Sequence, residues 1–136
     1  MKIPAWMILV SLVAACGGGG SSSIPQSDAC NQAASAGCAK FYSCEAAVAT
    51  SLFGTEDTCK TMIVASCGST GFQCSTTETY HGDKAAMCRD QFSAMDCNTL
   101  LQAVLPALGT NASLTSAFTA ITATLPVCAQ ICTAGT

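Results

Sequence analysis

The chain has 136 residues and a formal net charge of -3, and only 10% of its residues are charged. Nucleic acids and anionic lipid surfaces are bound electrostatically by clustered Lys and Arg. Here the basic residues beyond residue 2 are isolated from one another: Lys40, Lys60, Lys84 and Arg89. The charge pattern therefore excludes a nucleic-acid-binding protein, and we expect no nucleic-acid partner.

The first fifteen residues have the layout of a signal peptide. Lys2 precedes a mostly apolar run over residues 3–13, and two alanines then lead to Cys16. The run is too short to span a bilayer as a helix, which takes about 20 residues, and small residues are typical of a signal-peptide cleavage site. The sequence therefore predicts a signal peptide over residues 1–15.

The residues Val-Ala-Ala-Cys at positions 13–16 resemble the lipobox of bacterial lipoproteins. This resemblance implies that the sulfur of Cys16 carries diacylglycerol, that the signal peptide is cut before Cys16, and that the new amino group is acylated. Palmitate or a similar chain on Cys16 would then hold the protein to the membrane, because one chain binds only marginally and three bind lastingly. The alternative is an ordinary signal peptide cut after Ala15, which leaves Cys16 as an exposed, reactive thiol or an intermolecular partner.

A stretch of glycine and serine follows Cys16. Residues 17–23 contain no other residue type, which is typical of a flexible tether. We expect the lipidated cysteine and tether to occupy residues 16–27 and the folded domain to occupy residues 28–136. Gly17 in place of Asp favours the outer membrane, by resemblance to enterobacterial sorting. The expected location is thus the bacterial cell envelope, with membrane contact through the lipid and any protein partner unidentified.

Two helices are predicted at the start of the domain. The first begins at Ala29, where Asp28 can cap it, and ends before Gly54. The second follows Thr55, another capping residue, and ends at Gly68. Along the first helix, apolar residues recur at steps of three or four: Cys30, Ala34, Cys38, Phe41, Cys44, Val48 and Leu52.

A further helix is predicted before residue 95. Ser75 and Glu78 could form a capping box, although Gly82 and Asp83 leave the start of this helix open. Helical spacing then follows at Ala85, Cys88, Phe92 and Met95.

The remaining predicted helices are short. Asp96 is expected to cap one of them, and Pro106 and then Gly109 are expected to interrupt the chain after it. Apolar residues over 114–125 keep helical spacing, although their threonine neighbours lower the helix propensity. Pro126 is expected to open a last helical turn that carries Cys128 and Cys132. The predicted fold class is therefore all-α, a small disulfide-stapled bundle of four to five short helices.

The 11 cysteines predict disulfides. When Cys16 is set aside, an even ten remain in a small exported domain, which is typical of a disulfide framework. Because the chain has one histidine and no Cys-x-x-Cys pair, we expect no zinc or iron–sulfur site and no other cofactor. The candidates for bridges are Cys30, Cys38, Cys44, Cys59, Cys67, Cys74, Cys88, Cys97, Cys128 and Cys132.

The spacing of these cysteines suggests a pairing. Cys30 and Cys38 are eight residues apart, as are Cys59 and Cys67, and eight helical residues rise about 12 Å. Bridged cysteines have Cα atoms within about 7 Å of each other, so neither pair can close within one continuous helix. An antiparallel hairpin of the two helices would join Cys30 to Cys67 and Cys38 to Cys59. The partners of the other six cysteines stay open.

Several stretches of the domain resemble small cysteine-rich lipoproteins of myxobacterial type. The stretches, in order, are "CNQAASAGCAKFYSC", "FGTEDTC", "ASCGSTG", "MCRDQFSAMDC" and "PVC". Those proteins are helical and uncharacterised in function, so the resemblance implies a fold class without an activity.

The sequence contains no catalytic constellation. His81 is the first place to look for a base, but a loop residue beside Gly82 is the simpler interpretation. Cys128 and Cys132 are spaced one residue too far for a Cys-x-x-Cys redox pair. We therefore expect no catalytic residues and a non-catalytic structural or binding module. The alternatives are a thiol-disulfide or other small periplasmic enzyme, and an unanchored secreted disulfide scaffold.

Overall fold

The computed structural model describes residues 22–67, 71–108 and 120–135. Its helices are α1 (Ala29–Cys44), α2 (Ala46–Phe53), α3 (Glu56–Ser66), α4 (Gly82–Ala94) and α5 (Cys97–Leu108), and residues 120–124 are also helical. Two short 3-10 turns, η1 (Gln26–Asp28) and η2 (Pro126–Gln130), and two strands, β1 (Glu78–Tyr80) and β2 (Cys132–Ala134), complete these elements. The predicted class, a small disulfide-stapled helical domain, is confirmed.

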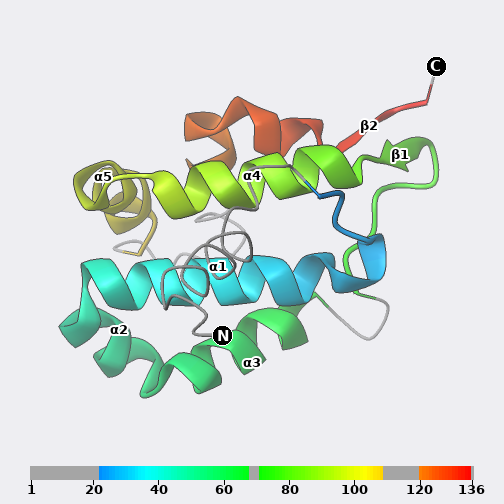
Figure 1. The fold of residues 1–136 in the computed structure, drawn as a ribbon. Helices are drawn as coiled ribbons and strands as arrows, with labels where there is room; N and C mark the ends of the chain where they lie inside the picture. Colours follow the sequence, from blue (N-terminus) through cyan, green and yellow to red (C-terminus); the bar gives the residue numbers. More distant parts are fainter. Residues whose placement is uncertain (1–21, 68–70, 109–119, 136) are drawn as a thin grey trace, which may run out of the picture.

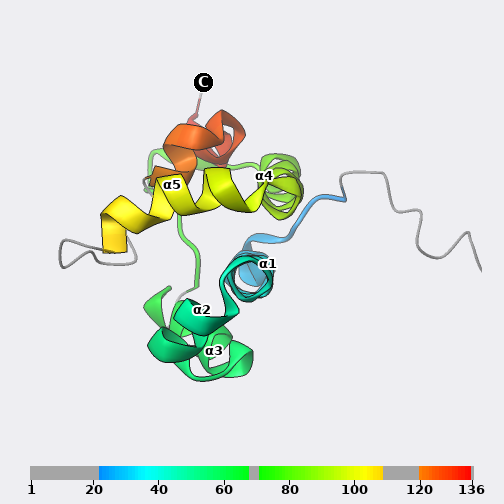
Figure 2. The ribbon, with the colours of Figure 1, turned by 90° about the vertical axis from the view of Figure 1, so that its left-hand side faces the viewer.

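Helix α1 is the central element of the fold. Figure 1 shows α3 along one side of α1 and α4 along the other, and Figure 2, in which α1 is seen end-on, shows the same order. The buried residues of α1 are Cys30, Ala34 and Cys38, which are spaced by four and therefore lie on one face. Because these side chains are small, disulfides take over much of the role that large apolar residues have in other cores.

The predicted first helix is two helices, which corrects the sequence interpretation. Glu45 interrupts it with φ -143° and ψ 64°. The N–H of Glu45 still donates to the Phe41 carbonyl at 2.9 Å, while its own carbonyl accepts from Ala49 at 2.8 Å and so begins α2. The Tyr42 hydroxyl donates to the Ala49 carbonyl across the bend at 3.3 Å. The bend turns α2 toward α3, while Cys44, bonded to Cys97, holds the end of α1 at the start of α5.

The domain begins earlier than the predicted boundary at residue 28. Ile24 is only 5% exposed and belongs to an apolar cluster with residues of α4 and η2. Its N–H donates to the Gly82 carbonyl at 3.0 Å, and its carbonyl accepts from the Tyr80 hydroxyl at 2.9 Å. Burial, with a smaller effect of Asp28, raises the pKa of Tyr80. Residues 24–27 are therefore part of the domain, because an apolar side chain at the end of the Gly/Ser stretch packs into the core.

The start of α1 is where the sequence places it, but the cap is different. Asp28 lies in the 3-10 turn η1 with φ -104° and ψ -5°, and its side chain makes no capping bond. Its carboxylate accepts from the side chain of Gln32 at 2.9 Å instead. The predicted cap is wrong because a capping residue normally has extended backbone, whereas the turn before α1 holds Asp28 in a helical conformation.

The predicted capping box at Ser75 and Glu78 starts a turn and a strand rather than a helix. The Glu78 carboxylate accepts from the Ser75 N–H at 3.1 Å, and the Glu78 N–H donates to the Ser75 carbonyl at 3.0 Å. Strand β1 then pairs antiparallel with β2, with Thr79 opposite Thr133. Local signals of this kind are shared by turns and helix starts, so the box alone did not distinguish them.

The carboxyl end of the chain also differs from its prediction. Cys128 lies in η2, but Cys132 lies on β2, so the two do not share a helical face. Each cysteine is bonded to a different part of the chain, Cys128 to Cys88 and Cys132 to Cys74. The second bond draws residues 132–134 away from η2 and against β1.

One other predicted helix end, at Pro106, can be compared with the structure. Pro106 lies inside α5, which runs on to Leu108, so the predicted end at Pro106 is wrong. A proline in the last turn removes only a bond near the helix end, which a helix tolerates better than a break in its middle. Gly68, Gly109 and the predicted helical residues 114–118 lie outside the described residues.

Candidate functional site

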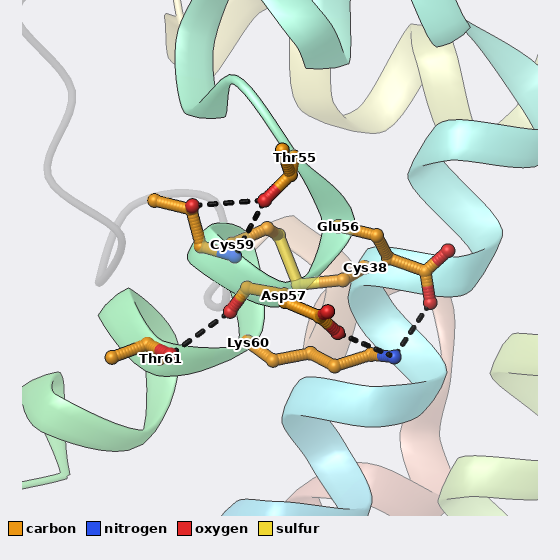
Figure 3. A network of polar contacts seen from close by, with 8 residues as sticks. Cys38, Thr55, Glu56, Asp57, Cys59, Lys60 and Thr61 are labelled. Atoms are coloured by element: carbon orange, nitrogen blue, oxygen red, sulfur yellow. Dashed lines mark hydrogen bonds and ion pairs between the residues drawn. A yellow bond between two sulfur atoms is a disulfide. The ribbon is translucent and has the colours of Figure 1, made fainter.

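Five disulfides join the helices and the two-stranded ribbon that β1 and β2 form. Cys30 is bonded to Cys67 and Cys38 to Cys59, with Cα atoms 6.5 and 6.0 Å apart. These two bridges hold α1 antiparallel to α3, and they are the two pairs predicted from the helix spacing. Figure 3 shows the second bridge beneath the first turn of α3.

The other three bridges connect parts that the sequence could not pair. Cys44 with Cys97 joins the end of α1 to the start of α5, Cys88 with Cys128 joins α4 to η2, and Cys74 with Cys132 joins the loop before β1 to β2. Every cysteine in the described residues is thus paired. Cys16, with the signal peptide and residues 17–21, lies outside them.

The first turn of α3 carries a polar network on the surface (Figure 3). The Thr55 hydroxyl caps the helix by accepting from the Thr58 N–H at 3.2 Å. The Lys60 ammonium lies 2.7 Å from the Glu56 carboxylate, and this hydrogen bond raises the pKa of Lys60. These side chains stabilise the start of α3 and lie at the surface, so we interpret their role as structural.

His81, the candidate base, is held by the ribbon. Its Nε2 lies 2.7 Å from the Thr133 hydroxyl, and its N–H donates to the Ile131 carbonyl at 2.8 Å. The two contacts tie the start of α4 to β2 and to Ile131 at the end of η2, the arrangement of a structural loop residue.

A cavity of about 420 Å³ lies where α1 passes α4 and the last turn of α3. Helix α1 contributes Cys30 and Gln32 to the lining together with the small residues Ala29, Ala33, Ala36 and Gly37, which recur at helical steps and therefore share one face. Nothing lies within 4 Å of a Cβ placed on Gly37. The cavity exists because this face of α1 has almost no side-chain volume to fill the space.

Larger apolar side chains close the rest of the cavity. It is lined by Phe92 of α4 and Ile63 of α3. Ile24, Phe72 and Ile131, which belong to or pack against the apolar cluster around Ile24, line it as well. The walls thus come from segments far apart in the sequence. A concave, mostly apolar space with few polar groups is the usual form of a small-molecule site.

Among the described residues, Arg89 is the one charged residue that lines this cavity. The Arg89 guanidinium of α4 donates from Nη1 to the Gln32 side chain of α1 at 3.2 Å. From Nε and Nη2 it contacts the Asp90 carboxylate at 2.8 and 2.7 Å. Gln32 is held in turn by Asp28. This chain of contacts fixes the guanidinium at the cavity, where 27% of its side chain is exposed.

Within residues 22–67, 71–108 and 120–135, no three His, Cys, Asp or Glu side chains come together in a way that could hold a metal ion. None of the helices in the same three ranges combines the length and the apolar character that crossing a bilayer requires.

Comparison with protein-family models, with curated proteins and with solved structures found no match to this chain. Sequence reasoning missed Gln32, Arg89 and the cavity. The signal was present in Ala29, Ala33, Ala36 and Gly37, whose regular spacing marks a helix face too small to fill a core.

Proposed function

We propose that the chain is a bacterial lipoprotein, anchored by lipid on Cys16 and carrying a non-catalytic binding module on a short Gly/Ser tether. The observation that carries the proposal is the pairing of the ten other cysteines among themselves. Five disulfides indicate an exported protein in an oxidising compartment. Cys16 is then the one cysteine without a partner in the domain, and lipid gives its sulfur a stable use.

The binding role is favoured over a thiol-disulfide enzyme. The reactive pair of such an enzyme is typically Cys-x-x-Cys, whereas the chain has no such pair and its described bridges join cysteines at least 21 residues apart. The cavity beside α1 offers a concave apolar surface that a purely structural scaffold would not need.

Counting free thiols distinguishes the candidates. The exported protein is unfolded without reductant and alkylated, and its mass is measured. A lipoprotein is expected to take up no alkyl group, because the Cys16 sulfur is a thioether. An unanchored scaffold would take up one group or run as a Cys16-linked dimer, and a thiol-disulfide enzyme in its reduced form would take up two or more.

Metabolic labelling tests the anchor directly. A palmitate analogue is expected to label the wild type and the control variant Ser22→Ala, and to be absent from Cys16→Ala. Absence of label on the wild type, or equal label on Cys16→Ala, would overturn the lipid anchor.

Outer-membrane location is a finer part of the proposal and depends on Gly17. Separation of the two membranes by density is expected to place the wild type in the outer fraction and Gly17→Asp in the inner one. Wild type in the inner fraction would refute this part while leaving the anchor in place.

A further inference from the structure

We propose that the cavity beside α1 binds a single aliphatic chain that ends in a carboxylate, the chemistry of a free long-chain fatty acid. Arg89 binds the carboxylate, and the apolar walls bind the chain. This inference rests on the binding-module part of the proposed function and is independent of lipid on Cys16.

The cavity has the dimensions and lining of a site for an aliphatic chain. Its volume of about 420 Å³ falls within the roughly 300–1,000 Å³ typical of small-molecule sites. Ala33, Ala36 and Gly37 form a smooth wall on α1, and Phe92, Ile63 and Ile121 face the same space. Each methylene that enters is removed from water, which is favourable, so an unbranched chain is well matched to these walls.

Charge selects the head group. Arg89 is the charged residue of the lining, and no carboxylate lines the cavity in the described part of the chain. A guanidinium has five N–H groups. Three are used by Gln32 and Asp90, which leaves two that no described residue accepts. Two N–H groups on a planar guanidinium suit a carboxylate, since charge-assisted bonds of this type are the strong ones.

The neighbours of Arg89 set its position and tune its charge. Gln32 holds Nη1 from α1, so the guanidinium keeps its position beside the cavity. Asp90 contacts the same guanidinium but its side chain is 55% exposed, which places it on the solvent side. Removing the Asp90 charge should therefore strengthen carboxylate binding, an effect opposite in sign to removing Arg89.

The test uses cis-parinaric acid, an intrinsically fluorescent fatty acid, and its methyl ester. The protein is the chain from residue 16 with Cys16→Ala, which carries no lipid and therefore needs no detergent that would compete for the cavity. It is made in an oxidising compartment so that its disulfides form. Saturable binding of the acid is expected, with the ester bound about tenfold more weakly because it lacks the charge. No saturable binding of the acid, or equal binding of both probes, would overturn the proposal.

Three variants assign the site. Gly37→Leu fills the cavity at a position with open space and should abolish binding, whereas Ser35→Leu on the exposed face of α1 should not. Arg89→Gln should weaken the acid about tenfold and leave the ester unchanged. Asp90→Asn should tighten the acid about threefold. Circular dichroism confirms that each variant is folded.

Other occupants give distinct results. If a second copy of the chain covers the cavity, light scattering will show a dimer that Gly37→Leu dissociates, and this outcome overturns the fatty-acid site. If Gly37→Leu binds the acid as the wild type does, the probe lies elsewhere and the assignment also fails. Neither result affects labelling of Cys16, so failure here and failure of the proposed anchor are separable.

Discussion

Removing the disulfide between Cys38 and Cys59 tests whether burial or loop length governs what each bridge contributes to stability. Cys38 is 0% exposed and Cys59 is 2% exposed, and their sequence separation of 21 is the shortest among the five described bridges. Cys74 and Cys132 are both partly exposed, and their separation is 58. The two bridges thus rank in opposite order by the two properties.

Loop entropy favours the longer loop. At 25 °C the chain-entropy model gives about 3.3 kcal/mol for a separation of 21 and about 4.2 kcal/mol for 58. Replacing Cys38 and Cys59 by Ala also removes two buried sulfur atoms, each costing about as much as one buried methyl group, roughly 0.5–1.5 kcal/mol. We therefore expect Cys38→Ala/Cys59→Ala to lose about 5 kcal/mol and Cys74→Ala/Cys132→Ala about 4 kcal/mol.

Guanidinium unfolding followed by far-UV circular dichroism measures both losses. The slope of the free energy against denaturant must be compared as well, because a chain that has lost a crosslink exposes more surface when it unfolds. If Cys74→Ala/Cys132→Ala is the less stable of the two, loop length dominates and the reasoning from burial is refuted.

Three further substitutions test local features. Asp96→Ala should destabilise at pH 7 and less at pH 2, because hydrogen bonds from Thr99 lower the pKa of the Asp96 carboxyl. Because the folded-state pKa is lowered, the carboxylate stabilises the fold at pH values above the ordinary Asp pKa, and this stabilisation is lost as the pH falls through the folded-state pKa. Equal losses of unfolding free energy at the two pH values in urea titrations would contradict this. Thr55→Ala should cost about 1 kcal/mol and Thr55→Ser much less, while similar urea midpoints for the two variants would argue against the cap. Gly37→Ala should stabilise α1 by up to about 1 kcal/mol. Gly54→Ala should destabilise the protein by about 1 kcal/mol or more, since φ of Gly54 is 75°. Thermal unfolding measures both changes, and shifts of the melting temperature in the same direction for the two variants would count against this account.

Helix starts were predictable where the deciding contact is local. The caps at Thr55 and Asp96 each accept from an N–H three residues along, so both partners are visible in a short stretch of sequence. The pairing of Cys30 with Cys67 was also within reach, because helix geometry fixes how far apart cysteines on one face must lie.

The features that the sequence did not reveal depend on contacts between distant segments. The bend at Glu45 keeps apolar residues at helical spacing on both sides, so periodicity cannot show it. Cys132 is helically spaced from Cys128, yet pairing with Tyr80 and the bond to Cys74 place it on a strand. The sequence did not mark Arg89 as part of a site, because its partner Gln32 on α1 lies 57 residues away.

The cavity and the disulfides have a common physical origin in α1. One face of the helix packs on α3 with Cys30, Ala34 and Cys38, and the face of Ala33 and Gly37 leaves space beside α4. An unfilled apolar space lowers stability, since its walls lose packing contacts. Bridges that constrain the unfolded chain offset that loss without filling the space. A domain built this way can keep an open apolar site at the centre of its fold, where a domain stabilised by packing alone would have to fill it.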